Sequence, residues 1–317
     1  MRTLRTESAI SSACGNRRCR VTAFADGPYA PRRAIVAGLA ALTAGPADGP
    51  AVLLLPGFTG SKEDFAPVLP LLAAAGLRGV AVDQRGQYES TGDPDGPDSQ
   101  FELAGLAADV ARAAAELGGP VHLVGHSFGG LVARAALLAH PEALASLVLL
   151  GSGPAAIVGP RGLALRAMFP LYDAGGLEAV WAAARAVDTV VRSPAEAEFL
   201  RRRFFASSER GMLVMGRALL AEPDRVATVA VAAAARAIPL LVAHGVGDDA
   251  WPPALQADMA ARLGARYEVI PDALHSPAAQ NPPATAGLLV AFVRDSAAVG
   301  SLAFEALAPP ADAAEVA

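Results

Sequence analysis

The distribution of apolar residues divides the chain into short strand-like runs that alternate with longer amphipathic segments. The apolar runs occupy residues 51–55, 79–82, 121–124, 147–150, 240–243 and 267–270. Between the first runs, residues 65–75 and 103–117 repeat apolar positions at helical spacing. Continuous apolar runs are typical of strands that are buried on both faces of a parallel sheet. The alternation therefore predicts an α/β protein with a doubly wound, mostly parallel sheet.

Residues 152–236 interrupt this alternation with an alanine-rich segment of helical period. Gly and Pro pairs break the segment at Gly159-Pro160, Gly175-Gly176 and Ser193-Pro194. Because these residues end or kink helices, we expect several short helices that form an inserted cap. The predicted organisation is a poorly ordered N-terminal extension at 1–33, core at 34–151, cap at 152–236, core at 237–296 and a C-terminal tail at 297–317.

Composition and charge argue against several classes of function. The chain has 317 residues, of which 53% are hydrophobic, enough for a sizeable core. Its net charge is −5, and residues 201–203 are the only dense basic run, which is typical of a solvated helix face. Cys14 and Cys19 have no His or Cys neighbours at zinc spacing. We therefore expect a small-molecule substrate, no nucleic-acid partner, no metal and no disulfide framework.

The N-terminal region contains the residues that could indicate the cellular location of the protein. No segment has the roughly 18 uncharged apolar residues that a membrane span requires. Arg32-Arg33 precedes an apolar stretch at residues 34–42, which vaguely resembles a twin-arginine export signal. However, residues 1–31 lie ahead of the pair, and the same stretch fits two short strands at 34–36 and 39–43. The strands are favoured, and with them a cytoplasmic enzyme, although export stays an open alternative.

The strongest chemical signal is Gly-His-Ser-Phe-Gly at residues 125–129, directly after a predicted strand. A serine between two glycines at a strand-to-helix junction can occupy a strained turn that exposes its hydroxyl, since glycine leaves room for the neighbouring backbone. The pattern predicts a nucleophile at Ser127. The N–H of Phe128 and an N–H in the loop after residues 51–55, at Phe58, are the expected oxyanion donors.

A serine nucleophile needs a base and a group that orients the base. His275 is the histidine that lies in a loop after a late strand, where such a base is expected. The orienting carboxylate is expected after the strand at 240–243, where Asp248 and Asp249 compete. The residues alone suit both aspartates equally.

These residues together resemble the α/β-hydrolase fold family over positions 34–296. The family uses the order nucleophile, acid, base, which Ser127, Asp248 and His275 reproduce, and its spacing favours Asp248 over Asp249. Residues 83–86, Asp-Gln-Arg-Gly, resemble a structural turn of the family. Pro56-Gly57 departs from the family's usual His-Gly, in which the His braces the oxyanion loop.

The resemblance implies a serine hydrolase that forms an acyl-enzyme and needs no cofactor. Related epoxide hydrolases and haloalkane dehalogenases carry an aspartate at the elbow, so Ser127 argues against those reactions. Apolar side chains of the cap and the acid loop predict a small to medium, largely apolar ester. The expected substrate contacts are Met168, Phe169, Trp181 and Trp251. Carbon–carbon bond hydrolysis, perhydrolysis or a non-catalytic ligand-binding role are the alternatives.

Overall fold

The fold is built on a single eight-stranded sheet in a computed structural model that describes residues 29–188 and 190–307, with side chains to residue 297. The strands are β1 (Arg32–Val36), β2 (Leu39–Ala44), β3 (Ala51–Leu55), β4 (Arg78–Val82), β5 (Val121–His126), β6 (Leu144–Leu150), β7 (Leu240–Gly245) and β8 (Arg266–Ile270). Their order is β1-β2-β4-β3-β5-β6-β7-β8. β2 runs antiparallel to β1 and β4, and the strands from β4 to β8 are parallel, which confirms the predicted fold class.

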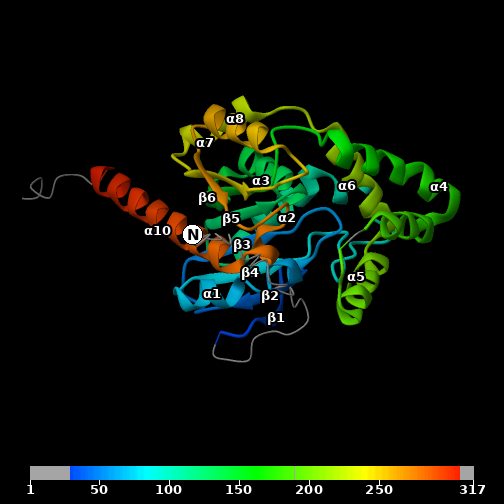
Figure 1. Ribbon diagram of the computed structural model, residues 1–317. Coiled ribbons are helices and arrows are strands. Elements are labelled where there is room, and N and C mark those ends of the chain that lie inside the picture. The colour runs from blue at the N-terminus through cyan, green and yellow to red at the C-terminus, as the bar shows by residue number, and fades with distance from the viewer. Residues whose placement is uncertain (1–28, 189, 308–317) are drawn as a thin grey trace, which may run out of the picture.

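Helices cover both faces of the sheet (Figure 1). They are α1 (Leu69–Ala74), α2 (Leu103–Glu116), α3 (Phe128–Ala139), α4 (Gly159–Val187), α5 (Pro194–Ala206), α6 (Glu209–Ala221), α7 (Val226–Ala235), α8 (Pro253–Leu263), α9 (Pro277–Gln280) and α10 (Pro282–Leu307), with short 3₁₀ turns η1 (Lys62–Phe65), η2 (Asp98–Phe101) and η3 (Pro141–Ala143). α2, α3, α7 and α8 share one apolar cluster, whereas α1 and α10 share the other.

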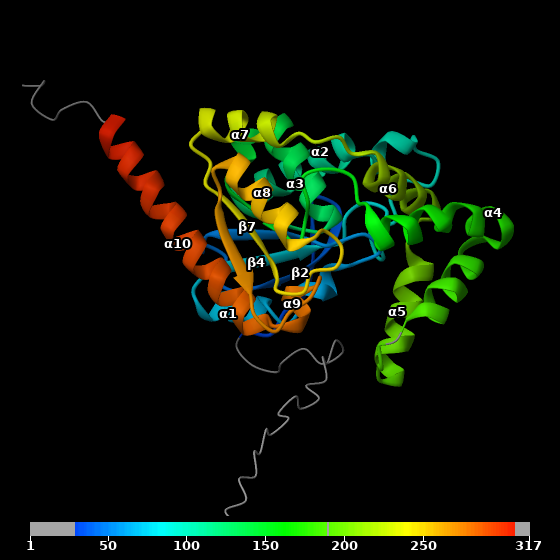
Figure 2. The ribbon, with the colours of Figure 1, turned by 45° about the horizontal axis from the view of Figure 1, so that its top comes forward.

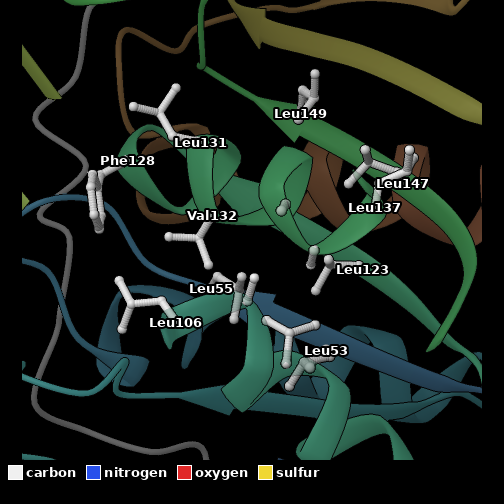
Figure 3. Packing of buried hydrophobic residues seen from close by; sticks show 14 of the residues in the cluster. Leu53, Leu55, Leu106, Leu123, Phe128, Leu131, Val132, Leu137, Leu147 and Leu149 are labelled. Carbon is white, nitrogen blue, oxygen red and sulfur yellow. The ribbon is translucent and has the colours of Figure 1, made fainter. Parts of the chain in front are cut away.

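Alternation along the central strands divides the core into these two clusters. Leu53, Leu55 and Leu123 point to the face that α2 and α3 cover (Figure 3), and Leu54 and Val124 belong to the opposite cluster. Successive side chains of a strand point to opposite faces, so a fully apolar strand needs helices on both sides. The continuous apolar runs of the sequence are thereby explained.

A helical insert, α4 to α7, separates β6 from β7 (Figure 2). α4 is kinked at Gly175 and Gly176, where φ of Gly176 is +63°, and α5 begins at Pro194 behind an N-cap at Ser193. The expected positions therefore begin or kink helices, but α4, with 29 residues, is longer than the short helices that were expected. α7 packs against α3 and α8, so the last helix of the stretch 152–236 lies with the helices of the core.

The first strand begins earlier, and the last helix ends later, than the sequence predicts. β1 begins at Arg32 and pairs Arg33 with Leu42, so the arginine pair is the start of a strand. Cys14, Cys19 and most of the predicted extension at 1–33 lie outside the described residues. α10 continues to Leu307, into the predicted tail at 297–317, because residues 295–307 contain good helix formers and no proline. Within the described ranges, we find no helix that is long and apolar enough to cross a membrane.

The junction between β5 and α3 holds a strained serine. Ser127 has φ +54° and ψ −117°, a region that residues with a Cβ rarely occupy. A Cβ at Gly125 would lie 2.3 Å from the Gly129 oxygen, and one at Gly129 would lie 2.5 Å from the Leu55 oxygen. The two glycines therefore leave room for the turn, as the motif predicts.

The strain at Ser127 leads to a first prediction. Ser127→Gly removes the backbone strain, whereas Ser127→Ala keeps it, and both lack the hydroxyl. We expect the glycine variant to be more stable by about 1 kcal/mol, after the greater entropy of glycine in the unfolded chain is deducted. Urea unfolding of the two variants measures the difference, and equal or reversed stabilities would contradict a strained elbow.

A second prediction concerns His122 in β5. Burial lowers the pKa of His122 to about 4, and its Nδ1 lies 2.8 Å from the Ser146 hydroxyl. The imidazole of the unfolded chain takes up a proton near pH 6.5, so unfolding is favoured as the pH falls from about 6.5 towards 4. Between pH 7 and 4.5, His122→Asn should lose about 2 kcal/mol less stability than the wild type in urea titrations. An unchanged pH dependence would argue against a neutral, buried His122.

Candidate active site

Four loops meet at the edge of the sheet where the parallel strands end. The loop after β3 carries Phe58, the turn after β5 carries Ser127, and the loops after β7 and β8 carry Asp248 and His275. Because β3, β5, β6, β7 and β8 are parallel, their carboxyl ends share one edge. Residues more than a hundred positions apart therefore become neighbours.

Ser127, His275 and Asp248 form a hydrogen-bonded chain. His275 Nε2 lies 3.0 Å from Ser127 Oγ, and His275 Nδ1 lies 3.0 Å from Asp248 Oδ1. A carboxylate can only accept, so Nδ1 carries the proton and Nε2 is left to accept from the serine hydroxyl. This is the arrangement that lets an imidazole take up a proton from the hydroxyl.

The carboxylate of Asp248 is buried and fully engaged. Its Oδ1 accepts the Ala250 N–H at 2.9 Å, and its Oδ2 accepts Gln256 Nε2 at 3.1 Å. Burial alone would raise the pKa of Asp248, but the hydrogen bond from His275, with those from Ala250 and Gln256, holds the pKa below its usual range. Asp248 therefore stays ionised beside the imidazole.

The neighbouring Asp249 has a different role. Its carboxylate accepts Arg161 Nη2 at 2.7 Å, and 62% of its side chain is exposed. Asp248 is thus the aspartate that the fold places beside His275, as the spacing in the family that the sequence resembles predicts.

Two residues that the sequence did not single out, His126 and Gln256, also contact this set of hydrogen-bonded residues. The elbow residue His126 is buried, and its Nε2 donates to the main-chain carbonyl of His275 at 2.7 Å. Burial, with the nearby His275, lowers the pKa of His126 to about 4, so the ring is neutral and can hold this donor. Gln256 lies in α8 and also donates to the Trp251 carbonyl at 2.9 Å. Its signal in the sequence was no more than a polar residue on an apolar helix face.

Two backbone N–H groups are available near the serine. Phe128 is the first residue of α3, so its N–H has no acceptor within the helix. The side chain of Phe128 points into the core (Figure 3), which leaves only its backbone at the turn. Gly57 and Phe58 line the same cavity as Ser127, and a Cβ on Gly57 would lie 3.1 Å from the Ser127 Cβ. The loop after β3, where an oxyanion donor is expected, therefore lies directly against the elbow.

A cavity of about 730 Å³ opens above the serine. Its floor contains Phe58, Ser127 and His275, and its roof comes from the helical insert. The apolar lining from the insert is Ile157, Ala164, Leu165, Ala167, Met168, Leu171, Val180, Trp181, Ala183, Ala184, Val187, Phe204 and Leu219. A mainly apolar cavity with a few convergent polar groups is typical of small-molecule sites.

The expected substrate contacts divide into two pairs. Met168 and Trp181 line the cavity, but Phe169 and Trp251 do not belong to its lining. Phe169 packs beneath the guanidinium of Arg217, 5.6 Å from the ring centroid. Trp251 is fully buried against Gly153, where an added Cβ would lie 2.0 Å from the indole. Neither aromatic side chain is therefore part of the cavity wall.

Two ion pairs at the cavity join the insert to the core. Arg161 of α4 pairs with Asp249, and Arg203 of α5 binds Asp64 Oδ1 at 2.6 Å. Each arginine in the lining is thus matched by a carboxylate of the core, and the cavity gains little net charge. This balance suits an uncharged ligand better than a strongly charged one.

Comparison with known proteins agrees with this geometry. The model of the alpha/beta hydrolase fold family matches residues 50–282. RutD of Variovorax paradoxus, named as a candidate carbamate hydrolase, is 43% identical over 109 residues, 34% of this chain and 40% of that protein. Fluoroacetate dehalogenase of a Burkholderia species is 36% identical over 104 residues, 32% of this chain and 34% of the dehalogenase. The chain spans about a third to two fifths of the length of these relatives.

Solved structures extend the likeness to most of the fold. A thermophilic esterase from Thermogutta terrifontis superposes with a TM-score of 0.67 at 22% identity, covering 84% of this chain and 99% of the esterase. At this level of identity, the superposition shows only that the two proteins share a fold. Because the family model matches well over half of the sequence, the chain belongs to the alpha/beta hydrolase fold family.

Proposed function

We propose that this protein is a serine hydrolase that cleaves carboxylic esters of small to medium, largely apolar substrates. The observation that carries the proposal is the 3.0 Å contact between Ser127 Oγ and His275 Nε2, at the floor of an apolar cavity. A hydroxyl placed against an imidazole that a carboxylate orients is the arrangement that acyl transfer requires. The esterase among the solved structures is consistent with this choice.

In the proposed reaction, Ser127 Oγ attacks the ester carbonyl while its proton passes to His275 Nε2. Asp248 stabilises the imidazolium, and the N–H groups of Phe58 and Phe128 bind the oxyanion. Collapse of the tetrahedral intermediate breaks the bond to the alcohol, which leaves with the proton from His275. Water, deprotonated by the same imidazole, then hydrolyses the acyl-enzyme and restores Ser127.

Other reactions in the family are less well supported. Fluoroacetate dehalogenase is among the relatives, but an aspartate nucleophile is expected for dehalogenation and epoxide opening, and this chain has Ser127 at the elbow. Carbon–carbon bond hydrolysis and perhydrolysis use the same three side chains, so an ester panel must be compared with those substrates directly. A role as a non-catalytic binder would leave the aligned hydroxyl, imidazole and carboxylate without a purpose.

The chain offers a matched pair of aspartates to test the proposal. With a p-nitrophenyl ester, Ser127→Ala and Asp248→Asn should each lower kcat/KM by about 10⁴-fold, since the nucleophile or the correct imidazole tautomer is lost. Asp249→Asn removes only an exposed ion pair worth under about 1 kcal/mol, so its kcat/KM should stay within about fivefold of the wild type. Equal losses at positions 248 and 249, or full turnover by Ser127→Ala, would show that the assignment is wrong.

A second pair of variants tests the cavity. Trp181→Ala enlarges the lining and should shift the preference towards longer acyl chains by about tenfold or more in relative kcat/KM, because each buried methylene contributes about 1 kcal/mol. Phe169→Ala, on the same helix but outside the cavity, should leave the chain-length profile unchanged. Ester hydrolysis across a series of acyl lengths measures both. A shift with Phe169→Ala alone would place the substrate elsewhere.

A further inference from the structure

Two buried glutamines in the turn after β4 hold the main chain of the loop after β3. Gln84 Nε2 donates to the Pro56 carbonyl at 2.8 Å, and Gln87 Nε2 donates to the Gly57 carbonyl at 2.8 Å. Both side chains are almost fully buried. The Gln84 N–H donates to Gln87 Oε1 at 3.1 Å, which fixes the Gln87 amide with its NH₂ group towards the loop.

The Gly57 carbonyl belongs to the same peptide unit as the Phe58 N–H. A trans peptide is planar, so its C=O and N–H point in opposite directions, and fixing the carbonyl also fixes the direction of the N–H. The Gly57 carbonyl accepts the Gly60 N–H as well, at 3.0 Å. Hydrogen bonds to a carbonyl polarise the peptide and strengthen its N–H as a donor. Gln87 thus acts on the very group that is proposed to bind the oxyanion.

The far end of the same loop is anchored on the same turn. Asp83 accepts the Lys62 N–H at 2.8 Å and Lys62 Nζ at 2.7 Å, and Glu89 accepts Lys62 Nζ at 2.7 Å. Burial alone would lower the pKa of Lys62, but Asp83 and Glu89 outweigh it and the pKa is raised, so the ammonium stays charged. With both ends of the loop tied to residues 83–89, the peptide between Gly57 and Phe58 has little freedom to rotate.

We propose that Gln87 is a positioning residue for the oxyanion hole: its side-chain amide orients and polarises the Gly57–Phe58 peptide so that the Phe58 N–H meets the developing negative charge. The proposal rests on the proposed function. Gln87 would act during the acyl-transfer steps, because the oxyanion forms in the transition state and the tetrahedral intermediate and is absent from the bound ester. A merely structural glutamine would affect stability, substrate binding and turnover together.

The test compares Gln87→Met with Gln84→Met. Both variants keep side-chain length and remove the amide donor to the loop, but the Gln84 bond is to the preceding peptide unit, which carries the Gly57 N–H. Gln87→Met also removes Oε1, which accepts the Gln84 N–H. We expect Gln87→Met to lower kcat for the p-nitrophenyl ester by about 10- to 100-fold, less than the loss of an oxyanion donor itself, with KM within about twofold. Gln84→Met should lose clearly less of kcat.

A short alkyl trifluoromethyl ketone supplies a readout of the oxyanion hole. Ser127 Oγ forms a bond to the ketone carbon, the carbonyl π bond breaks, the hydroxyl proton passes to His275, and the negative charge on oxygen occupies the hole. The affinity of Gln87→Met for this inhibitor should fall in parallel with kcat, while the affinity for the matching unfluorinated ketone stays within about twofold, as expected for interactions made only in the transition state. Gln87→Leu, which is close in size and has no donor, provides the same comparison if the methionine variant does not fold.

The outcomes separate the two proposals. Wild-type turnover that depends on Ser127, combined with unchanged inhibitor affinity in the Gln87 variants, would overturn the role of Gln87 and leave the hydrolase intact. Equal losses of kcat in the Gln84 and Gln87 variants, accompanied by a rise in KM, would also overturn it, since both glutamines would then be structural. Absence of Ser127-dependent turnover in the wild type would refute the hydrolase, and the oxyanion role with it.

Discussion

The proposed activity of this protein depends on one hydrogen bond, between Ser127 Oγ and His275 Nε2. This bond joins residues that are 148 positions apart in the sequence. Neither partner can be placed by local structure alone. The serine is held by a strained turn between β5 and α3, and the histidine by a loop after β8 that is fixed to Asp248 and to His126. The parallel sheet makes the contact possible because it ends all of these strands at the same edge.

Around that bond, the candidate reacting groups lie on the core and most of the cavity wall lies on the insert. The core supplies the hydroxyl, the imidazole, the carboxylate and the backbone donors, all fixed by strand ends and buried amides. The insert between β6 and β7 supplies most of the apolar cavity wall, and it is joined to the core at the cavity by arginine–carboxylate pairs. In the proposed hydrolase, substitutions in the insert would therefore change which acyl group fits without moving the reacting atoms.

Much of this arrangement could be predicted from the sequence. Strands buried on both faces leave continuous apolar runs, and the elbow glycines leave a short motif, so the sheet and Ser127 follow from local pattern. The choice between Asp248 and Asp249 needed spacing from the resembling family, because adjacent aspartates after a strand look alike. Phe169 and Trp251, two of the four expected substrate contacts, lie outside the cavity lining, and an aromatic residue beside a site has the same sequence signature whether it contacts substrate or packs in the core.

The supporting polar residues were harder to foresee. Gln87 acts on a carbonyl 30 residues away and His126 on one 149 residues away, and neither contact leaves a local pattern. Both contacts form because the fold places the turns after β3, β4 and β8 next to one another. In the α/β-hydrolase family, a His before the glycine usually braces the loop that is expected to bind the oxyanion. Here Pro56 takes that place, and Gln84 and Gln87 of the neighbouring turn donate hydrogen bonds to the main chain of the loop.

The central claim, that His275 activates Ser127 as a nucleophile, is tested most directly by covalent labelling. The full chain would be incubated with a fluorophosphonate probe, and peptide mass spectrometry would locate the adduct in the wild type and in His275→Ala. We expect a single phosphonylated residue, Ser127, and a rate of labelling that falls sharply without the imidazole. No adduct at Ser127, or labelling at an undiminished rate in the His275 variant, would contradict it.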